Sequence, residues 1–337
     1  MDKKVRIAVA GICGFGGAHV RGVMAEINAD QAELVGVCDI KEDAVKAMGE
    51  KYHVPYTTDF DELIARDDVD AVILALPDQI HAEFAIKALK AGKHVLCEKP
   101  MALELDDCKK MVKAADEADT YLMVGQICRF TPAFVQAKKM VDEGEIGELF
   151  FVEGEYAHDY AHIQTPWRKD PKAPRHGMVG GGCHSVDLLR WVAGNPTEVF
   201  AYSNHKMLPD WPTDDCTIAV MQFPNNVIGK VFCSTGCKRD YTMRTLFYGS
   251  KGTIIVDNRN STFSVFREDI AEGREVKIEC AINNHAAELE IDQFCKCILT
   301  NTPPAINSRE GATTVSICSA ILQSAKEHKP VSVDYDF

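Results

Sequence analysis

The sequence has no apolar run near the length of a membrane span and no cluster of Lys and Arg. A membrane-spanning helix needs about 20 consecutive apolar residues, and no segment of the 337 residues approaches that length. The formal net charge is -13, so contacts to the phosphates of nucleic acid have no electrostatic basis. We expect neither nucleic acid nor a membrane as a partner.

Paired cysteines at metal-ligand spacing are also missing. The thirteen cysteines are an odd number spread over the whole chain, without a C-x-x-C pair. This pattern predicts reduced thiols packed as small hydrophobic groups, and no metal site. The apolar run before Gly11 is too short for a signal peptide, which favours a cytoplasmic protein.

Residues 1–126 alternate short apolar runs with segments of helical spacing, and we interpret them as one domain. Continuous apolar runs are typical of strands buried on both faces of a parallel sheet with crossover helices. The expected strands are 5–11, 32–39, 71–77, 94–100 and 121–126, and the expected helices are 16–29, 41–52, 61–66, 79–90 and 104–118. The fold class is α/β, with a doubly wound parallel sheet in this half.

Residues 127–337 show a different pattern and are predicted to form a second, α+β domain. Runs with strand alternation, such as GELFFVEGEYAH and CTIAVMQF, are separated by turn sequences such as FPNNV and GSKGT. Such turns join antiparallel neighbours. We expect a large, mostly antiparallel open sheet, with helices near 183–193, 285–299 and 309–327.

The segment AGICGFGGAHVRG (10–22) follows the first expected strand and begins a helix. Glycines here let the backbone approach a pyrophosphate, and the helix N-terminus offers N–H groups to it. The middle glycine of G-x-G-x-x-G is replaced by Cys13, with Gly14 beside it, so a simple tight turn stays an alternative. Asp39, at the end of the second strand, can accept hydrogen bonds from ribose hydroxyls, which favours NAD over NADP. Capping of the next helix is the other interpretation of Asp39.

GKHVLCEKPMAL (92–103) places Glu98, Lys99 and Pro100 at the end of an apolar strand. Ligands of an open α/β sheet bind beyond the carboxyl ends of its strands, so these charges can face a crevice. Side chains of adjacent extended residues point to opposite sides. One of the two charged side chains can therefore meet a substrate while the other faces cofactor or backbone.

With these motifs the chain resembles the Gfo/Idh/MocA family of NAD(P)-dependent sugar and polyol oxidoreductases. The resemblance extends through LPDQIHAEFAIKAL (76–89), RFTPAF (129–134), GGGCHSVDLLRW (180–191) and LFYGSKGTIIVD (246–257). It implies a Rossmann domain, then a domain whose open sheet often forms an oligomer interface, hence a homodimer or homotetramer. The predicted cofactor contacts are Gly11, Cys13, Gly14, Phe15, Gly16, Asp39, Pro77, His81, Glu98 and Lys99.

The predicted catalytic residues are Lys99, His184 and Asp187. Oxidation of a secondary alcohol needs a base for the hydroxyl proton, and a histidine with a pKa of about 6.5 suits this role. Lys99 can stabilise the developing alkoxide, the role that the resemblance implies. Asp187, one helical turn after His184, either orients its ring or makes a structural hydrogen bond.

One position departs from the family pattern. Inositol-dehydrogenase-like members have an Asp four residues before the catalytic His, and this chain has Gly180. A replacement is expected within residues 155–176, a stretch rich in His, Tyr, Trp and Arg. The candidate substrate residues are Arg129, His158, Asp159, Tyr160, His162, Trp167 and Arg168. Surface loops, and an interdomain salt bridge for Arg129, are the alternatives.

These observations favour an NAD-dependent oxidoreductase that transfers hydride between a secondary hydroxyl of a sugar, polyol or sugar derivative and nicotinamide. A second hypothesis retains NAD and oxidises a glycoside transiently, before elimination or hydrolysis. A third is a dinucleotide-sensing regulatory protein on the same scaffold. The presence of both Lys99 and His184 argues against the third.

Overall fold

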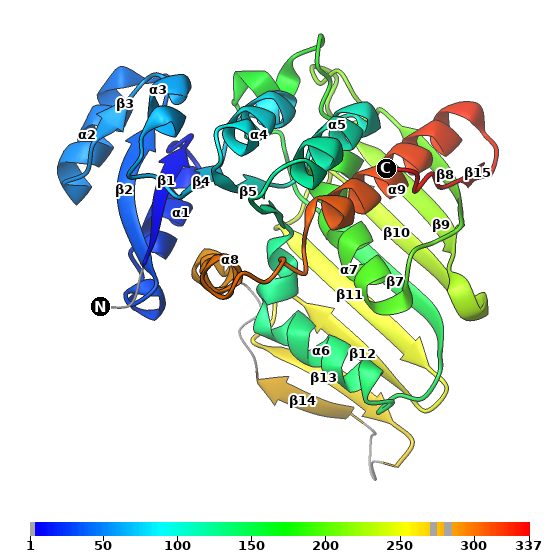
Figure 1. Ribbon diagram of the computed structural model, residues 1–337. Coiled ribbons are helices and arrows are strands. Elements are labelled where there is room, and N and C mark those ends of the chain that lie inside the picture. The colour runs from blue at the N-terminus through cyan, green and yellow to red at the C-terminus, as the bar shows by residue number, and fades with distance from the viewer. Residues whose placement is uncertain (1–3, 270–274, 280–284) are drawn as a thin grey trace. The chain divides into compact units, whose positions relative to one another are not determined.

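The computed structural model describes residues 4–269, 275–279 and 285–337, which form two units (Figure 1). The first unit contains the chain through Ile127, together with residues 286–312 and 337, and the second contains 128–285 and 313–336. The predicted division after residue 126 differs from this in the segment 286–312. None of the helices in the described part of the chain has the length and apolar character that a membrane span requires.

The first unit is built on a six-stranded parallel sheet in the order β3-β2-β1-β4-β5-β6. Its strands are β1 (Val5–Ala10), β2 (Ala32–Cys38), β3 (Tyr56–Thr57), β4 (Ala71–Leu74), β5 (His94–Glu98) and β6 (Leu122–Gly125). The apolar runs form strands because both faces are covered: every residue of β4 and β6 is buried. The predicted doubly wound sheet is confirmed, and β3, only two residues long, was not predicted.

The crossover helices are α1 (Gly16–Val23), α2 (Glu42–Tyr52), α3 (Phe60–Ala65), α4 (His81–Lys90) and α5 (Leu105–Asp116). Helix α8 (Ala287–Thr300) also belongs to this unit. It packs on α1, where Ile291 fills the space beside Gly22, and the side-chain amide of Asn28 donates to the carbonyl of Glu288 at 3.0 Å. These partners are about 260 residues apart in sequence, so no local pattern indicates them.

The second unit contains a nine-stranded sheet in the order β14-β13-β12-β11-β7-β10-β9-β8-β15. Among the described strands β7 pairs with β10 in parallel and the other neighbours are antiparallel. The strands are β7 (Leu149–Ala157), β8 (Glu198–Asn204), β9 (Cys216–Gln222), β10 (Ile228–Ser234), β11 (Thr242–Gly249), β12 (Gly252–Asp257), β13 (Thr262–Arg267), β14 (Glu275–Glu279) and β15 (Val331–Ser332). The predicted mostly antiparallel sheet is confirmed.

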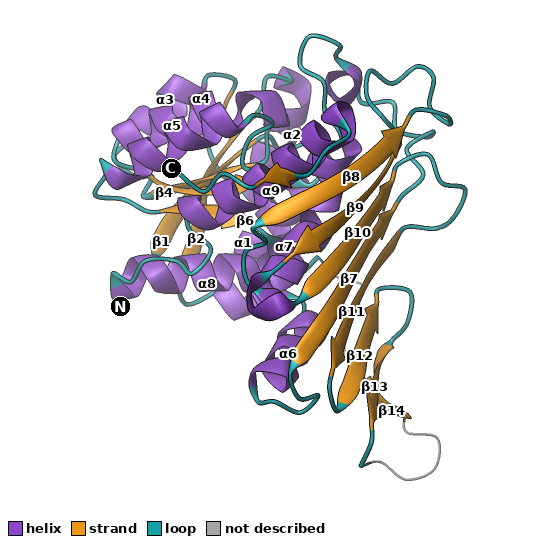
Figure 2. Cartoon of the chain, turned by 90° about the vertical axis from the view of Figure 1, so that its right-hand side faces the viewer, coloured by secondary structure: helices purple, strands orange, loops and turns teal. Residues whose placement is uncertain are grey.

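Helices α6 (Pro132–Asp142) and α7 (Cys183–Ala193) lie on one face of this sheet (Figure 2), and α9 spans Ser308–Glu327. A short π-helix, Met178–Gly182, leads into α7.

Large apolar side chains of the sheet are exposed to solvent, namely Phe150, Tyr202, Ile218, Val220 and Ile228. The homo-oligomer expected from the sequence stays a prediction.

Candidate active site

Three glycines shape the turn between β1 and α1. Gly11 and Gly14 have φ values of +81° and +66°, which favour glycine. A Cβ on Gly11 would lie 2.4 Å from the carbonyl oxygen of Ala75, and one on Gly16 would lie 1.7 Å from that of Gly11. Cys13, Gly14 and Phe15 form the exposed part of the turn. The backbone is therefore accessible where α1 begins, as a pyrophosphate-binding turn requires.

Asp39, directly after β2, is hydrogen-bonded to this turn. Its Oδ2 accepts a hydrogen bond from the backbone N–H of Ile12 at 3.0 Å, and its Oδ1 accepts one from Lys41 N–H at 3.0 Å. The carboxylate is 9% exposed. The glycine turn and the acidic residue expected to bind ribose are thus held together, and the residues present suit the adenosine end of NAD.

His81 lies at the start of α4, after the short 3-10 helix Asp78–Ile80 that Pro77 precedes. Its two ring nitrogens face carbonyl oxygens, Nδ1 that of Pro100 and Nε2 that of Leu76, each at 2.9 Å. Only an imidazolium donates to both. Burial alone would lower the pKa of His81, but Cys97, Asp78 and the Pro100 carbonyl outweigh it and raise the pKa to about 10. The buried His81 imidazolium therefore donates one hydrogen bond to the segment that follows β4 and one to the segment that follows β5.

Glu98 and Lys99 differ in surroundings, as expected of adjacent extended residues. Glu98 is 8% exposed and its Oε1 lies 2.7 Å from Nε2 of His19, while Lys99 is half-buried. Burial favours the neutral acid, but the hydrogen bond and charge of His19 outweigh it, so the pKa of Glu98 is lowered. Glu98 thus faces the interior of the first unit. Lys99 remains the predicted electrostatic catalyst.

In the second unit His184 lies near the start of α7 and is 5% exposed. Its Nδ1 is 3.2 Å from Sγ of Cys128. The Cys128 thiol in turn donates to Sδ of Met243 at 3.5 Å. With the thiol hydrogen directed to Met243, the sulfur can accept a hydrogen bond from Nδ1–H; this is the tautomer in which Nε2 carries the lone pair. This tautomer suits a general base that acts through Nε2.

Asp187, which lies on α7 like His184, is at the centre of a buried ion-pair network. Arg129 donates to both carboxylate oxygens, Nε to Oδ2 at 2.8 Å and Nη2 to Oδ1 at 2.6 Å. Thr314 and Arg190 also donate to Oδ1, at 3.1 and 3.4 Å. All these residues belong to the second unit. Asp187 therefore makes structural hydrogen bonds, one of its two predicted roles, and it engages Arg129, a predicted substrate residue.

Aromatic side chains with polar atoms gather beside His184. The Tyr156 ring lies 6.3 Å from that of His184, in a stacked arrangement, and its hydroxyl is 3.2 Å from Nδ1 of His158 and 3.1 Å from the hydroxyl of Tyr160. Tyr241 lies against His158, with ring centroids 4.9 Å apart. Burial, and then Tyr160, raise the pKa of Tyr156 well above its ordinary value. Two predicted substrate residues, His158 and Tyr160, are thus brought near His184 through Tyr156.

The other predicted substrate residues lie on the segment that follows. The guanidinium of Arg168 lies over the rings of Trp167 and Tyr160, at 5.1 and 6.0 Å from their centroids. His162 is exposed, and Asp159 pairs with Lys238 at 3.3 Å. Arg168 and Trp167 therefore adjoin the cluster that contains Tyr160.

Arg175, from the same segment, occupies the place that a side chain at position 180 would take. A Cβ on Gly180 would lie 2.0 Å from Nη1 of Arg175. Nη2 of Arg175 donates to the carbonyl of Gly180 at 2.8 Å, and the guanidinium lies over the Trp167 ring at 5.6 Å. Gly181 likewise makes room for Tyr156: a Cβ added to Gly181 would lie 2.4 Å from the Tyr156 ring. The glycines before His184 therefore permit close packing of an arginine and a tyrosine.

The sequence interpretation did not single out several residues of these arrangements, among them Cys128, Tyr156, Arg175, Tyr241 and His19. Cys128 was grouped with the packed thiols. Glu290, a buried residue of α8 that lies near His19 and Glu98, carries no local motif. His19 follows the last glycine of the turn by three residues, a spacing that could have drawn attention to it. Its partner Glu98 is 79 residues away.

Comparison with known proteins identifies the family. Residues 5–126 match the oxidoreductase family with an NAD-binding Rossmann fold, and residues 134–255 match the GFO/IDH/MocA C-terminal domain. The chain belongs to the Gfo/Idh/MocA family. It is therefore an NAD(P)-dependent oxidoreductase, and the predicted Rossmann domain and NAD cofactor are confirmed.

Similarity to curated relatives extends over nearly the whole chain. A myo-inositol 2-dehydrogenase of Thermotoga maritima is 27% identical over 346 aligned positions, covering 98% of this chain and 99% of the relative. A scyllo-inositol 2-dehydrogenase (NAD(+)) of Bacillus subtilis is 24% identical, with coverages of 99% and 98%. A levoglucosan dehydrogenase solved with NADH has a TM-score of 0.91 at 23% identity, covering 98% of this chain and 100% of that chain. This last likeness concerns the fold alone.

Proposed function

We propose that this family member oxidises a secondary hydroxyl of a sugar, polyol or sugar derivative with NAD, or reduces the matching ketone. The main support is the similarity to inositol dehydrogenases over 98% of the chain. The second unit supports the same substrate class, because hydroxyl and imidazole groups of Tyr156, His158 and Tyr160 gather beside His184. Such groups suit a ligand with several hydroxyls.

In this proposal His184 Nε2 takes the hydroxyl proton of the alcohol. The contact between Nδ1 and Cys128 supports the required tautomer. The Lys99 ammonium stabilises the negative charge that develops on the alcohol oxygen. NAD, when bound, would supply the hydride acceptor, so oxidation of the alcohol to a ketone would be balanced by reduction of NAD to NADH, with the proton leaving through His184.

The first experiment incubates the protein with NAD and a panel of free sugars, polyols, sugar acids and glycosides, following NADH absorbance and products together. We expect NADH to accumulate with a product two hydrogens lighter than its substrate. A cleaved or eliminated product without net NADH would replace the proposal with redox-neutral chemistry. Binding of NAD without turnover of any compound would favour a regulatory protein.

The active substrate then tests the residue roles. Lys99→Ala and His184→Ala should each lower kcat by about 10²- to 10⁴-fold, the usual contribution of a positioned acid, base or charge. Affinity for NADH, followed by fluorescence titration, should stay near that of the unchanged protein. Near-normal turnover of either variant would contradict its catalytic assignment.

A further inference from the structure

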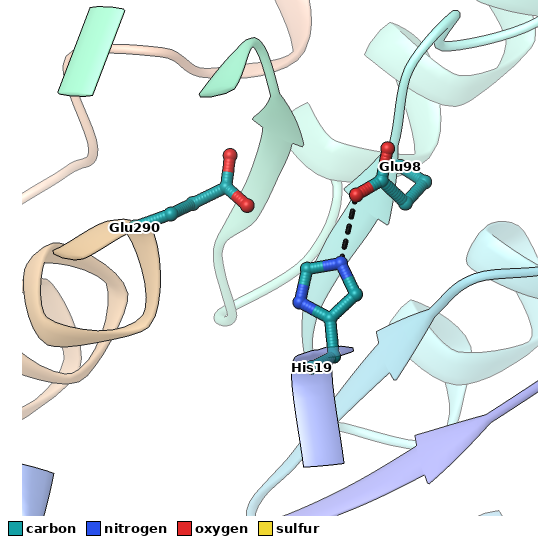
Figure 3. A group of neighbouring side chains, drawn as sticks. All are labelled: His19, Glu98 and Glu290. Atoms are coloured by element: carbon teal, nitrogen blue, oxygen red, sulfur yellow. Dashed lines mark hydrogen bonds and ion pairs between the residues drawn. The ribbon is translucent and has the colours of Figure 1, made fainter. Parts of the chain in front are cut away.

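Helix α8 brings a third ionisable side chain to the buried pair His19 and Glu98. His19 comes from α1, Glu98 ends β5, and Glu290 lies on α8. Figure 3 shows the Glu290 carboxylate directed toward the other two side chains. One candidate ligand atom from each lies within 4.8 Å of the others, and the residues are 0%, 8% and 0% exposed. All three belong to the first unit.

The Glu290 carboxylate is buried, and no described residue makes a hydrogen bond to it. Neither of its carboxylate oxygens, nor Nδ1 of His19, has a hydrogen-bond partner in the described part of the chain. Burial, and then the charge of Glu98, raise the pKa of Glu290 well above its ordinary value. An ionised carboxylate in this position is costly unless it is paired or coordinates a metal. The buried Glu290 carboxylate therefore needs either a bound cation or a proton to neutralise its charge.

We infer that His19, Glu98 and Glu290 form a binding site for one divalent transition-metal ion such as Zn²⁺. One imidazole nitrogen and two carboxylates are donors that such ions accept. His19 would bind the ion as the neutral ring, so the positive charge beside Glu98 would then come from the metal. One divalent ion neutralises both carboxylates. A proton on Glu290 would also remove its charge, and the metal content of the purified protein distinguishes the two.

The geometry needs a small contraction to hold an ion. Zinc lies about 2.0–2.2 Å from nitrogen and oxygen ligands, so two donors on one ion are at most about 4.4 Å apart. The candidate ligand atoms in this structure lie within 4.8 Å of one another, which is slightly more than this distance. Rotation of the Glu290 side chain can close the difference. Gly125, paired with Glu98 across β5 and β6, lies beside the cluster: a Cβ at this position would be in ordinary van der Waals contact with Oε1 of Glu290, at 3.5 Å.

The bound ion would join α8 to α1 and β5. Two hydrogen bonds already hold α8 to the segment after α1: Asn28 to the Glu288 carbonyl at 3.0 Å and Gln31 to Asp292 at 2.6 Å. A metal would add a link that includes the sheet. Its role is structural, so metal content and stability are the relevant measurements.

The test uses the full-length protein without an affinity tag. Metal content is measured by mass spectrometry, and the midpoint of thermal unfolding is followed after chelation and after stepwise return of Zn²⁺. Glu290→Gln removes a ligand charge with almost no change of shape. Glu288→Gln is the matched control, because Glu288 is a half-buried glutamate of the same helix outside the cluster.

We expect about one zinc per chain, a lower unfolding midpoint after chelation, and recovery when Zn²⁺ returns. Glu290→Gln should lose both the stoichiometric metal and the response, and Glu288→Gln should keep them. Absence of metal, with no response of the unchanged protein to Zn²⁺, would overturn the inference and leave Glu290 as a proton carrier. Equal binding by Glu290→Gln would also overturn it, because the ion would then lie elsewhere.

Discussion

Sγ of Cys128 lies 3.2 Å from Nδ1 of His184. Donation of the thiol hydrogen to Met243 leaves the sulfur as an acceptor, a combination that favours the His184 tautomer with its proton on Nδ1. A fixed tautomer matters for a base, because a ring that carries its proton on Nε2 cannot take one there. In the proposed reaction Cys128 would therefore position His184 without contacting the substrate.

Cys128→Ala should lower kcat by about fivefold, the worth of one hydrogen bond of about 1 kcal/mol. The loss should come with a changed acidic limb of the pH profile of kcat, whereas a packing role would leave the profile unchanged. Cys128→Ser, which keeps an acceptor, should recover part of the rate. Cys216→Ser, a half-buried cysteine on β9, is the control. An unaltered profile in Cys128→Ala would contradict the positioning role.

Asp39→Ala should weaken NADH binding by roughly tenfold or more, because a charged hydrogen-bond acceptor is lost. The preference for NADH over NADPH should also fall, since the carboxylate no longer repels a 2′-phosphate. Titrations with both dinucleotides measure the two effects. Asp43→Asn, exposed in the first turn of α2, is the matched control.

Asp39 also holds the glycine turn through Ile12 N–H, so Asp39→Asn separates the two roles. The amide oxygen can still support the turn, but the negative charge is gone. If neither variant changes the NADH to NADPH ratio, the ribose contact lies on another residue.

Much of the fold was predictable because its signals are local. Buried parallel strands are continuous apolar runs, and the glycine turn and Asp39 follow consecutive strands of the same motif. The strand order and the two-residue β3 depend on pairing between distant segments. Helix α8 was assigned to the second domain because its packing on Gly22 and Asn28 depends on contacts about 260 residues apart.

The candidate site likewise contains residues that a local sequence motif indicates and residues that no local motif indicates. EKP and the GGGCHSVD segment are sequence motifs, so Lys99 and His184 could be selected from them. Cys128 and Glu290 could not, since a thiol and a helical glutamate have no distinctive pattern until their partners are known. The sequence predicts that residues 155–176 supply the contact an Asp at position 180 would make, and this stays a prediction. Arg175 of that stretch, which was not among the named candidates, occupies the space beside Gly180.

The stability contributed by His81 should depend on pH. Its folded pKa, about 10, lies above the ordinary value of 6.5, so its contribution is complete below pH 6.5 and is lost as the pH rises toward 10. The greatest slope is about 1.4 kcal/mol per pH unit. The difference in unfolding free energy between the unchanged protein and His81→Gln should therefore shrink over this range.

His53 supplies the control, because it is exposed and has a positive φ that Asn tolerates. His53→Asn should leave the pH dependence of stability as it was. A constant difference between His81→Gln and the unchanged protein from pH 6.5 to 10 would mean that His81 is neutral when folded. One of its two carbonyl contacts would then lack a donor.

Gly180→Ala tests whether Arg175 fills the place of a side chain at position 180. The added Cβ would lie 2.0 Å from the guanidinium, so Arg175, which is 3% exposed, must leave its contacts with the Gly180 carbonyl and Trp167. We expect a lower midpoint of thermal unfolding. In an Arg175→Ala background the same substitution should cost less, with a coupling of about 0.5–3 kcal/mol, as found for residues in contact. Strictly additive effects would show that the two positions do not compete for one space, and the close packing before His184 would need another explanation.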